Sequence, residues 1–339
     1  MELQHRINAF HKLSEVLRRL GTSATEEDSE LLALCKASNG WFNEENVQFA
    51  CLHWSQLLSQ DALETWAGNY DLEQVDPKTV AIIMAGNVPL VGFHDFLAVL
   101  LSGHKALVKL SSNDPHLLPY LAKELMAIEP GFEDRISFAE EQLANFDAVI
   151  ATGSNNTARY FDHYFGKYPG IIRKNRNSVA VLNGSESEEE LTALADDIFR
   201  YYGLGCRNVS KLYVPKGYNF DSFFQAAYGW RRVINDHKYI NNYDYNKAVY
   251  LMSNISLLDN EFLLLKEDEG YSSPISVVFY EYYEDLSSLR KDLNNAVEDI
   301  QCVVSDGSME GSVPFGTTQT PGLSVYADGV DTLQMLQQL

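Results

Sequence analysis

Cys206 is the residue whose surroundings best suit covalent chemistry, because it lies in the segment Gly203-Leu204-Gly205-Cys206 between a predicted helix and a predicted strand. A nucleophilic cysteine needs an exposed thiol and nearby backbone N–H groups that can hold an oxyanion. The two glycines let the backbone bend and leave room for a ligand. A buried cysteine that packs as a small apolar side chain is the alternative, and local sequence leaves it open. The other cysteines lie in helical or strand patterns and are predicted to be structural: Cys35, Cys51 and Cys302.

Two junctions that follow apolar runs carry further candidates. Asn87 comes after the run Thr79 to Ala85, in a Gly-Asn-Val-Pro turn. Its amide could donate to an oxyanion, although asparagine is also a common turn residue. Gly153 and Ser154 lie where a strand passes into a helix, and N–H groups at a helix start can hold a phosphate or the nicotinamide end of a cofactor. This is not G-x-G-x-x-G, so the dinucleotide signal is weak by itself.

A third group is basic. Arg173, Lys174 and Arg176 fall within four positions, which favours a solvated basic turn and leaves an anion site as the alternative. The eight histidines form no pair at ligand spacing, and the four cysteines include no C-x-x-C pair, so no metal site is predicted.

Composition limits the classes of protein. A chain of 339 residues with 45% hydrophobic and 22% charged residues is typical of a globular protein of about two domains. The net charge is −21, and such an acidic surface repels phosphate backbones and anionic lipid, which argues against nucleic-acid binding. Polar residues interrupt the most apolar segment, 80–101, so no membrane span is predicted. These features, with the cysteine usage of a reducing compartment, predict a soluble cytoplasmic protein.

Helices and strands alternate after a helical N-terminus that reaches about residue 75. Strands are expected at 79–85, 105–110 and 146–151, followed by helices that reach Leu101, open at Asp114-Pro115 and run from Asn156 to Phe165. This order predicts a parallel, doubly wound sheet whose ligands bind at the carboxyl ends of the strands.

A second unit follows, with strands expected at 178–182, 211–214 and 274–280 and an amphipathic helix over 188–202. Residues 228–250 show no clear periodicity and are left unassigned. The predicted organisation is a helical N-terminus with a cofactor domain (1–177), a catalytic domain (178–315) and a C-terminal segment (316–339).

The order of these short motifs resembles the aldehyde dehydrogenase superfamily, and within it the acyl-CoA reductases related to the bioluminescence fatty-acyl reductase. The motifs are A-G-N-V-P, K-L-S-S, A-T-G-S before a helix, G-L-G-C before a strand that ends in V-P, and P-F-G, and they cover roughly residues 78–325. The resemblance implies an α/β fold with a Rossmann-like cofactor domain and an α/β catalytic domain. It also implies reduction of an acyl-CoA to an aldehyde through a cysteine acyl-enzyme. The chain is shorter than typical members of the superfamily. Whether it forms a homo-oligomer is left open.

The resemblance also implies roles for individual residues. Cys206 is the nucleophile and Asn87 the oxyanion amide. Lys109 and Ser111 contact the adenosine end of the cofactor, and Gly153 and Ser154 lie near its pyrophosphate and nicotinamide. Glu269, in D-E-G-Y-S-S-P, matches the glutamate that holds the nicotinamide ribose, with the spacing off by one.

Two departures from the family pattern refine the expectation. Hydrolytic members carry a water-activating glutamate where this chain has Arg173 to Ser178, without a carboxylate. The absence of this carboxylate predicts that the enzyme releases aldehyde rather than acid. The charges of Arg173 and Arg176 would instead favour binding of the phosphates of CoA. Ser112 stands where NAD-preferring members often have glutamate, which predicts NADPH as the cofactor, with NADH as the alternative. An acyl-phosphate reductase and a catalytically silent relative that binds acyl groups or a partner protein are the alternative functions, and bulky Arg207 beside Cys206 favours the silent one.

Overall fold

The computed structural model describes residues 1–22, 25–140, 142–153 and 155–339, which divide into two compact units. Unit 1 comprises Met1–Lys174 and Gly322–Leu339, and unit 2 comprises Asn175–Pro321. The domain limits expected from the sequence stay predictions. In the structure the chain from Gly322 onward packs into unit 1.

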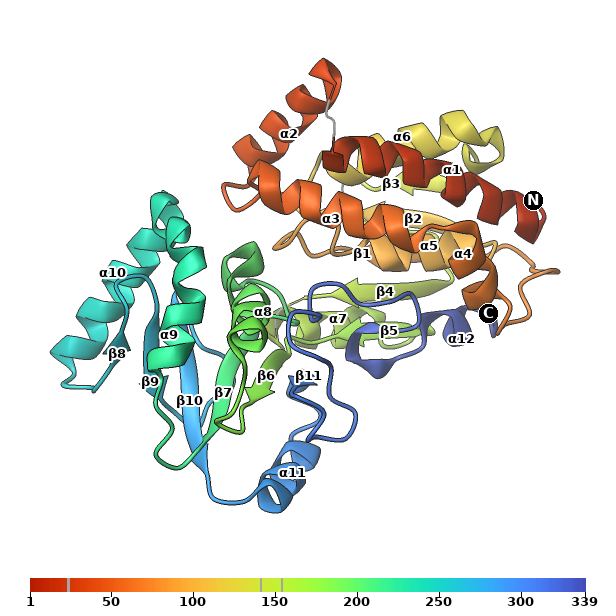
Figure 1. Ribbon diagram of the computed structural model, residues 1–339. Helices are drawn as coiled ribbons and strands as arrows, with labels where there is room; N and C mark the ends of the chain where they lie inside the picture. Colours follow the sequence, from red (N-terminus) through yellow and green to blue (C-terminus); the bar gives the residue numbers. More distant parts are fainter. Residues whose placement is uncertain (23–24, 141, 154) are drawn as a thin grey trace. The chain divides into compact units, whose positions relative to one another are not determined.

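The helical N-terminus of unit 1 forms because apolar residues recur at helical spacing. α1 buries Phe10, Leu13 and Leu17 among other apolar residues along one face. Its neighbour α3 runs beside it (Figure 1). Side chains of Thr25, Asn43 and Ser59 cap the N-termini of the next three helices. The four helices are α1 (Leu3–Thr22), α2 (Glu26–Ser38), α3 (Glu44–Leu57) and α4 (Gln60–Ala67).

The sheet of unit 1 is parallel throughout, with strand order β3-β2-β1-β4-β5. Its strands are β1 (Thr79–Ile83), β2 (Lys105–Lys109), β3 (Ile136–Phe138), β4 (Ala148–Thr152) and β5 (Gly170–Arg173). The connections are α5 (Phe93–Leu101), α6 (Leu117–Ile128) with η1 (Pro130–Phe132), and α7 (Asn155–Phe165). Phe161 and Phe165 of α7 pack on the face that presents Ala81 and Val149. The doubly wound parallel sheet expected from the sequence is therefore confirmed.

The C-terminal segment is held in unit 1 by aromatic and polar contacts. Trp66 Nε1 donates to the Tyr326 hydroxyl at 2.8 Å, and the Tyr70 hydroxyl donates to Asp331 at 2.7 Å. His94 Nε2 lies 2.8 Å from the carbonyl oxygen of Leu323. This segment includes η4 (Ala327–Gly329) and α12 (Thr332–Leu336).

Unit 2 contains a second sheet, with strand order β11-β6-β7-β10-β9-β8, in which only the β8–β9 pair is antiparallel. The strands are β6 (Asn177–Val181), β7 (Val209–Pro215), β8 (Leu258–Asp259), β9 (Leu264–Glu267), β10 (Val277–Tyr283) and β11 (Ile300–Val304). The helices are α8 (Glu188–Phe199), η2 (Arg200–Gly203), α9 (Asp221–Ala227), η3 (Tyr228–Asn235), α10 (His237–Met252) and α11 (Leu286–Asn295). The unassigned residues 228–250 thus form two helices, with Asp236 between them as the N-cap of α10.

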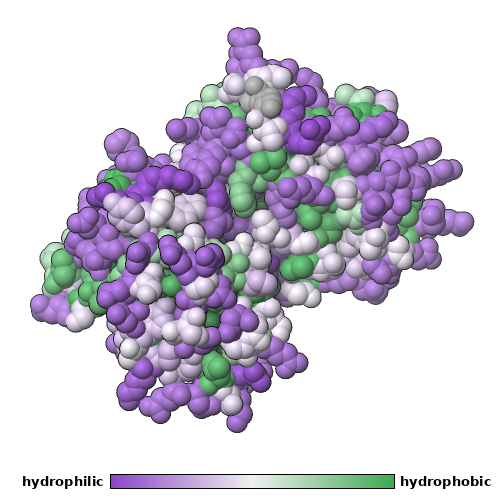
Figure 2. Space-filling view, in the orientation of Figure 1, coloured by the Kyte–Doolittle hydropathy of each residue, from purple (hydrophilic) through white to green (hydrophobic). Residues whose placement is uncertain are grey.

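The face of the molecule in Figure 2 is largely hydrophilic, with hydrophobic residues in small patches, as the net charge of −21 leads one to expect. Among the helices described here, none combines the length and the apolar character that crossing a membrane requires.

Candidate active site

Cys206 occupies the turn between η2 and β7 in unit 2, and its side chain is partly exposed. Cys35 and Cys51, in contrast, are buried in unit 1. Burial raises the pKa of the Cys35 thiol to about 12 and that of the Cys51 thiol further still. These two thiols are therefore protonated at neutral pH and shielded from solvent, whereas Cys206 is accessible to a substrate.

The backbone that leads into Cys206 is strained. The sequence predicts a helix through Tyr202, but α8 ends at Phe199, and Tyr201 and Tyr202 have left-handed φ values of 56° and 59°. Such values are uncommon for bulky residues and cost about 1–3 kcal/mol each, so the surrounding structure must hold them in place. Both tyrosines are buried, and the ring of Tyr202 lies 6.1 Å from that of Tyr239, whose hydroxyl donates to the Phe262 carbonyl at 2.9 Å. Tertiary packing therefore sets the direction in which the chain reaches the thiol.

Ser178 anchors the Cys206 turn from the neighbouring strand β6. Its hydroxyl donates to the carbonyl oxygen of Cys206 at 2.9 Å and lies 2.9 Å from the sulfur of Cys302. The Ser178 N–H donates to the carbonyl of Asn208 at 3.2 Å, which fixes the other side of the turn. Burial raises the pKa of the Cys302 thiol to about 11, so Cys302 is protonated at neutral pH. Ser178 was not predicted as a site residue. The one feature of the sequence that could have indicated it is a hydroxyl side chain at the start of an apolar strand.

Asn87 is an exposed residue in the turn that follows β1 in unit 1. The preceding residue, Gly86, is buried, and its carbonyl accepts a hydrogen bond from Asn39 Nδ2 at 3.1 Å. A Cβ atom on Gly86 would lie 2.6 Å from both Cβ and Oγ of Ser111. The turn is therefore held between the C-cap residue of α2 and the loop after β2. Asn39, buried and distant in sequence, carries no signal that would have revealed this contact.

The ends of β1 and β4 coincide with the point where the strand order of the sheet reverses. β1 pairs with β2 on one side and with β4 on the other, all in parallel. Asn87 follows β1 and Gly153 follows β4, so both lie at the carboxyl edge around this reversal, where doubly wound sheets bind their ligands. Ser154, the other predicted residue of this junction, lies outside the described residues.

The end of β2 carries the residues expected at the adenosine end of a cofactor. Lys109 is the last residue of the strand, and its ammonium donates to the carbonyls of Glu140 at 2.7 Å and Ala139 at 3.4 Å. Ser111 Oγ accepts from the N–H of Asn113 at 3.2 Å, and Ser112 is exposed. The structure thus places Lys109, Ser111 and Ser112 at the same carboxyl edge as Asn87 and Gly153.

This edge has the donor set that a dinucleotide requires. The helices α5 and α7 begin shortly after β1 and β4, and helix N-termini present N–H groups that suit a pyrophosphate. The cap residue of α5, Gly92, contributes no side-chain hydrogen bond to the first turn. The close packing of Gly86 against Ser111 draws the loops after β1 and β2 together. These residues therefore fit a nicotinamide dinucleotide.

The predicted basic cluster does not form one site. Arg173 is buried and makes an ion pair with Asp95, and its Nη2 donates to Thr332 Oγ1 at 3.1 Å. This corrects the expectation of an exposed basic turn at Arg173, and the burial of the guanidinium argues against its expected contact with substrate. Arg176 belongs to unit 2, where it donates to the Val297 carbonyl at 3.0 Å, and Lys174 is exposed.

Glu269 lies in unit 2 between β9 and β10, and its side chain is exposed. Its carbonyl oxygen accepts a hydrogen bond from Lys211 Nζ at 2.8 Å. Lys211 is fully buried in β7, a position that sequence reasoning missed because a lysine in a strand is usually exposed.

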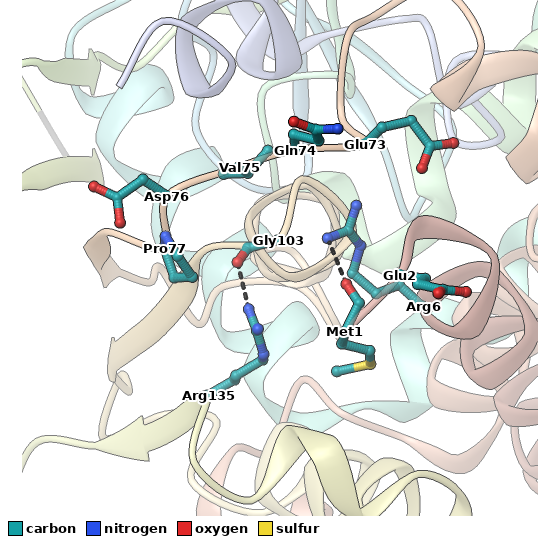
Figure 3. A pocket seen from close by; sticks show the side chains of 10 residues that line it. All are labelled: Met1, Glu2, Arg6, Glu73, Gln74, Val75, Asp76, Pro77, Gly103 and Arg135. Carbon is teal, nitrogen blue, oxygen red and sulfur yellow. Dashed lines mark hydrogen bonds between the residues drawn. The ribbon is translucent and has the colours of Figure 1, made fainter.

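A pocket of about 500 Å³ lies at the opposite, amino-terminal edge of the unit 1 sheet (Figure 3). Its two guanidinium groups hold backbone carbonyls: Arg6 donates to Met1 and Leu72, and Arg135 donates to Gly103. The arginines thus brace the ends of elements, and this edge is separate from the one that carries Asn87 and Gly153. Within the described ranges, no group of three or more histidine, cysteine, aspartate or glutamate side chains is arranged to hold a metal ion.

Comparison with known proteins adds a family and a fold. A family model described as acyl-CoA reductase (LuxC) matches residues 11–225. The long-chain acyl-protein thioester reductase of Vibrio harveyi is 25% identical over 146 residues, which make up 39% of this chain and 31% of that protein. The enzyme of the same name from Photorhabdus laumondii is 24% identical over 153 residues, 40% of this chain and 32% of that protein. The alignments thus span about a third of the length of these relatives.

Solved structures of aldehyde dehydrogenases share the fold. Aldehyde dehydrogenase 21 from Physcomitrella patens, in complex with succinate, superimposes with a TM-score of 0.73 at 14% identity and covers 100% of this chain and 84% of its own. An aldehyde dehydrogenase from Bacillus cereus in complex with NAD⁺ gives a TM-score of 0.64 at 14% identity, over 90% of this chain and 72% of its own. The expected aldehyde-dehydrogenase-like α/β fold is confirmed.

Proposed function

The chain belongs to the acyl-CoA reductase (LuxC) family, and on that premise we propose that it reduces an acyl thioester to an aldehyde through an acyl-enzyme on Cys206. The observation that carries the proposal is the setting of Cys206: a partly exposed thiol on a turn that buried tyrosines and Ser178 hold in place. The curated relatives are named as thioester reductases, which supports the same reaction class.

In the first step the Cys206 thiolate attacks the carbonyl carbon of the thioester. The C–S bond to Cys206 forms, the carbonyl oxygen becomes an oxyanion, and collapse of this intermediate expels the carrier thiolate, which takes up a proton. Asn87 Nδ2 and the N–H of Cys206 donate to the oxyanion in this proposal. The hydrogen bond from Ser178 to the Cys206 carbonyl holds the peptide group that follows the nucleophile in one orientation.

The second step reduces the acyl-enzyme. A nicotinamide cofactor, when bound, would supply the hydride that reduces the acyl group on Cys206 to a thiohemiacetal. Lys109, Ser111 and Gly153 would hold the cofactor at the carboxyl edge of the unit 1 sheet, and Glu269 would hold its nicotinamide ribose. Asn87 and the Cys206 N–H again stabilise the oxyanion, and its collapse breaks the C–S bond, releases aldehyde and restores the Cys206 thiolate.

The product is proposed to be aldehyde because the chain lacks a base for hydrolysis where hydrolytic relatives carry one. Hydrolysis of the acyl-enzyme needs a general base beside a water molecule. Residues 173–178 contain no carboxylate, and the Arg173 guanidinium is engaged by Asp95. Free carboxylic acid formed at a steady rate from aldehyde and NADP⁺ without CoA would contradict this part of the proposal.

The carrier of the acyl group is CoA in our proposal, following the family description. An acyl-protein thioester is the second candidate, because both curated relatives are named for that substrate. An assay of NADPH oxidation separates these candidates and the acyl-phosphate alternative. It compares kcat/KM for three substrates: acyl-CoA, an acylated carrier protein and an acyl phosphate. The carrier with the highest kcat/KM identifies the substrate class.

Intact-mass spectrometry after incubation with palmitoyl-CoA, in the absence of cofactor, tests the proposal directly. Wild type and Cys302→Ala should each gain one acyl group, and Cys206→Ala should gain none. NADPH should then remove the adduct from the wild type and release palmitaldehyde. An adduct that persists in Cys206→Ala, or no adduct in wild type with any carrier, would refute the assignment, and the second outcome would favour a silent relative.

A further inference from the structure

Lys211 has an environment that a structural lysine rarely has. It lies on β7, the strand that follows Cys206, and its side chain is fully buried. An ammonium group removed from water is costly unless other groups compensate its charge and its three N–H donors. The groups that compensate the charge and the donors of the Lys211 ammonium therefore show which segment this lysine holds in place.

The partners of Lys211 are one carboxylate, one carbonyl and two aromatic rings. Nζ donates to Glu281 Oε2 at 2.6 Å and to the carbonyl oxygen of Glu269 at 2.8 Å. It lies 4.7 Å from the ring centroid of Tyr213 and 5.1 Å from that of Tyr271. Two of these four contacts are made to the short segment that contains Glu269 and Tyr271.

A β-bulge in β7 brings a second side chain to the same segment. Ser178 of β6 pairs with Val209, but the next residue, Val179, pairs with Lys211, so Ser210 is the extra residue. Ser210 Oγ donates to the carbonyl oxygen of Tyr271 at 2.6 Å. In a regular strand consecutive side chains point to opposite faces, and Ser210 and Lys211 would not both reach one segment. The bulge makes this double contact compatible with the strand.

Ser210 and Lys211 thus hold the carbonyls on either side of Gly270. The Glu269 carboxylate is exposed and accepts no hydrogen bond from the described residues, so its position depends on the backbone that carries it. We propose that Ser210 and Lys211 are positioning residues that set the place of the Glu269 carboxylate for the cofactor. The inference rests on the proposed function, in which Glu269 contacts the nicotinamide ribose.

Loss of these hydrogen bonds should affect the two steps of the reaction differently. Acylation of Cys206 does not need the cofactor, so loss of the Ser210 and Lys211 hydrogen bonds should leave it nearly unchanged. Cofactor affinity should fall, because Glu269 no longer has a fixed position. Loss of a hydrogen bond from a charged donor corresponds to roughly tenfold to hundredfold in an equilibrium constant, so Lys211→Met should weaken NADPH binding by about that factor.

The experiment measures the Kd of NADPH by fluorescence and the rate of Cys206 acylation by intact mass. Ser210→Ala and Lys211→Met should each raise the Kd, with acylation within about twofold of wild type, and Glu269→Ala should raise the Kd at least as much. Glu281→Gln is the matched control, since it removes the ion pair of Lys211 but leaves its bond to the Glu269 carbonyl, and it should raise the Kd less than Lys211→Met. Ser210→Ala removes only one hydroxyl group and is the milder change. It therefore tests the inference even if Lys211→Met fails to fold.

A double-mutant comparison separates positioning from a general structural role. If Lys211 and Ser210 act through Glu269, then adding Ser210→Ala or Lys211→Met to Glu269→Ala should raise the Kd no further. Additive losses, or an unchanged Kd in Ser210→Ala and Lys211→Met, would overturn the inference. Failure of the proposed function shows separately, as wild type that is not acylated at Cys206. An unchanged Kd in Glu269→Ala would remove the role of Glu269 and with it the inference.

Discussion

Replacing Gly86 with alanine is expected to disturb catalysis through a single methyl group. The new Cβ would lie 2.6 Å from both Cβ and Oγ of Ser111, and 3.2 Å from the N–H nitrogen of Asp114. Ordinary contacts begin near 3.4 Å, so the loop after β1 must move by at least about 0.8 Å relative to the loop after β2. Asn87 is the next residue and moves with it.

The size of the effect follows from this displacement. An error of about 1 Å in the placement of a reacting group can cost roughly 100-fold in rate, and overpacking of this kind costs about 1–3 kcal/mol of stability. Gly86→Ala should therefore lower kcat for acyl reduction by about two orders of magnitude, and chemical denaturation should show a loss of stability within that range.

Three further variants test the cause. Gly92→Ala lies in the same connection, but the three atoms nearest to its Cβ all belong to the flexible side chain of Met84, from 2.7 Å, so kcat should fall by less than about threefold. Ser111→Gly removes the two atoms at 2.6 Å and leaves only the milder approach to the Asp114 nitrogen at 3.2 Å, so kcat of the double variant should recover most of the way to that of Ser111→Gly alone. Steady-state NADPH oxidation measures kcat of the wild type and of all four variants. Wild-type kcat in Gly86→Ala, or no recovery in the double variant, would refute the argument.

Three other predictions follow from individual residues. Asn87→Ala should lower kcat by roughly 100- to 1,000-fold with little change in KM, as loss of one oxyanion donor does, and a change in KM alone would make Asn87 a turn or binding residue. Ser112→Glu should shift the preference measured by kcat/KM from NADPH toward NADH, because a carboxylate there repels a 2′-phosphate, and equal kcat/KM for both cofactors in wild type would contradict the NADPH assignment. Burial acts to raise the pKa of Asp28, but hydrogen bonds from Arg19 and Thr25 outweigh it and lower the pKa from 3.8 to about 2. Asp28 therefore stabilises the fold above about pH 4 and loses this contribution as the pH falls toward 2, so urea denaturation should show a smaller deficit for Asp28→Asn at pH 2.5 than at pH 7.

Local patterns in the sequence were sufficient for the fold class. The run Thr79 to Ala85 and the segment 105–110 are apolar enough to predict buried strands, and β1 and β2 lie within these limits. Glycines between elements correctly predicted the ends of helices. One example is Gly103, which follows α5 and has a φ of 95°. The same junctions placed Asn87 and Gly153 after strands, because a residue's place in a short turn depends on its immediate neighbours. The catalytic roles of these residues stay predictions.

The tertiary structure decided every contact that joins distant residues. Arg173 pairs with Asp95 across 78 positions, and Ser178 bonds the Cys206 carbonyl across 28. No local pattern encodes either pair, since each depends on which strands and helices become neighbours. Tyr201 and Tyr202 are the sharpest case: the amphipathic pattern favours a helix through both, but both are buried, Tyr202 against Tyr239, in a left-handed conformation that neither would adopt alone. The left-handed conformation costs about 1–3 kcal/mol per residue, and burial of a large apolar side chain contributes about 1.5–3 kcal/mol, so packing offsets the local cost and determines the path of the chain into Cys206.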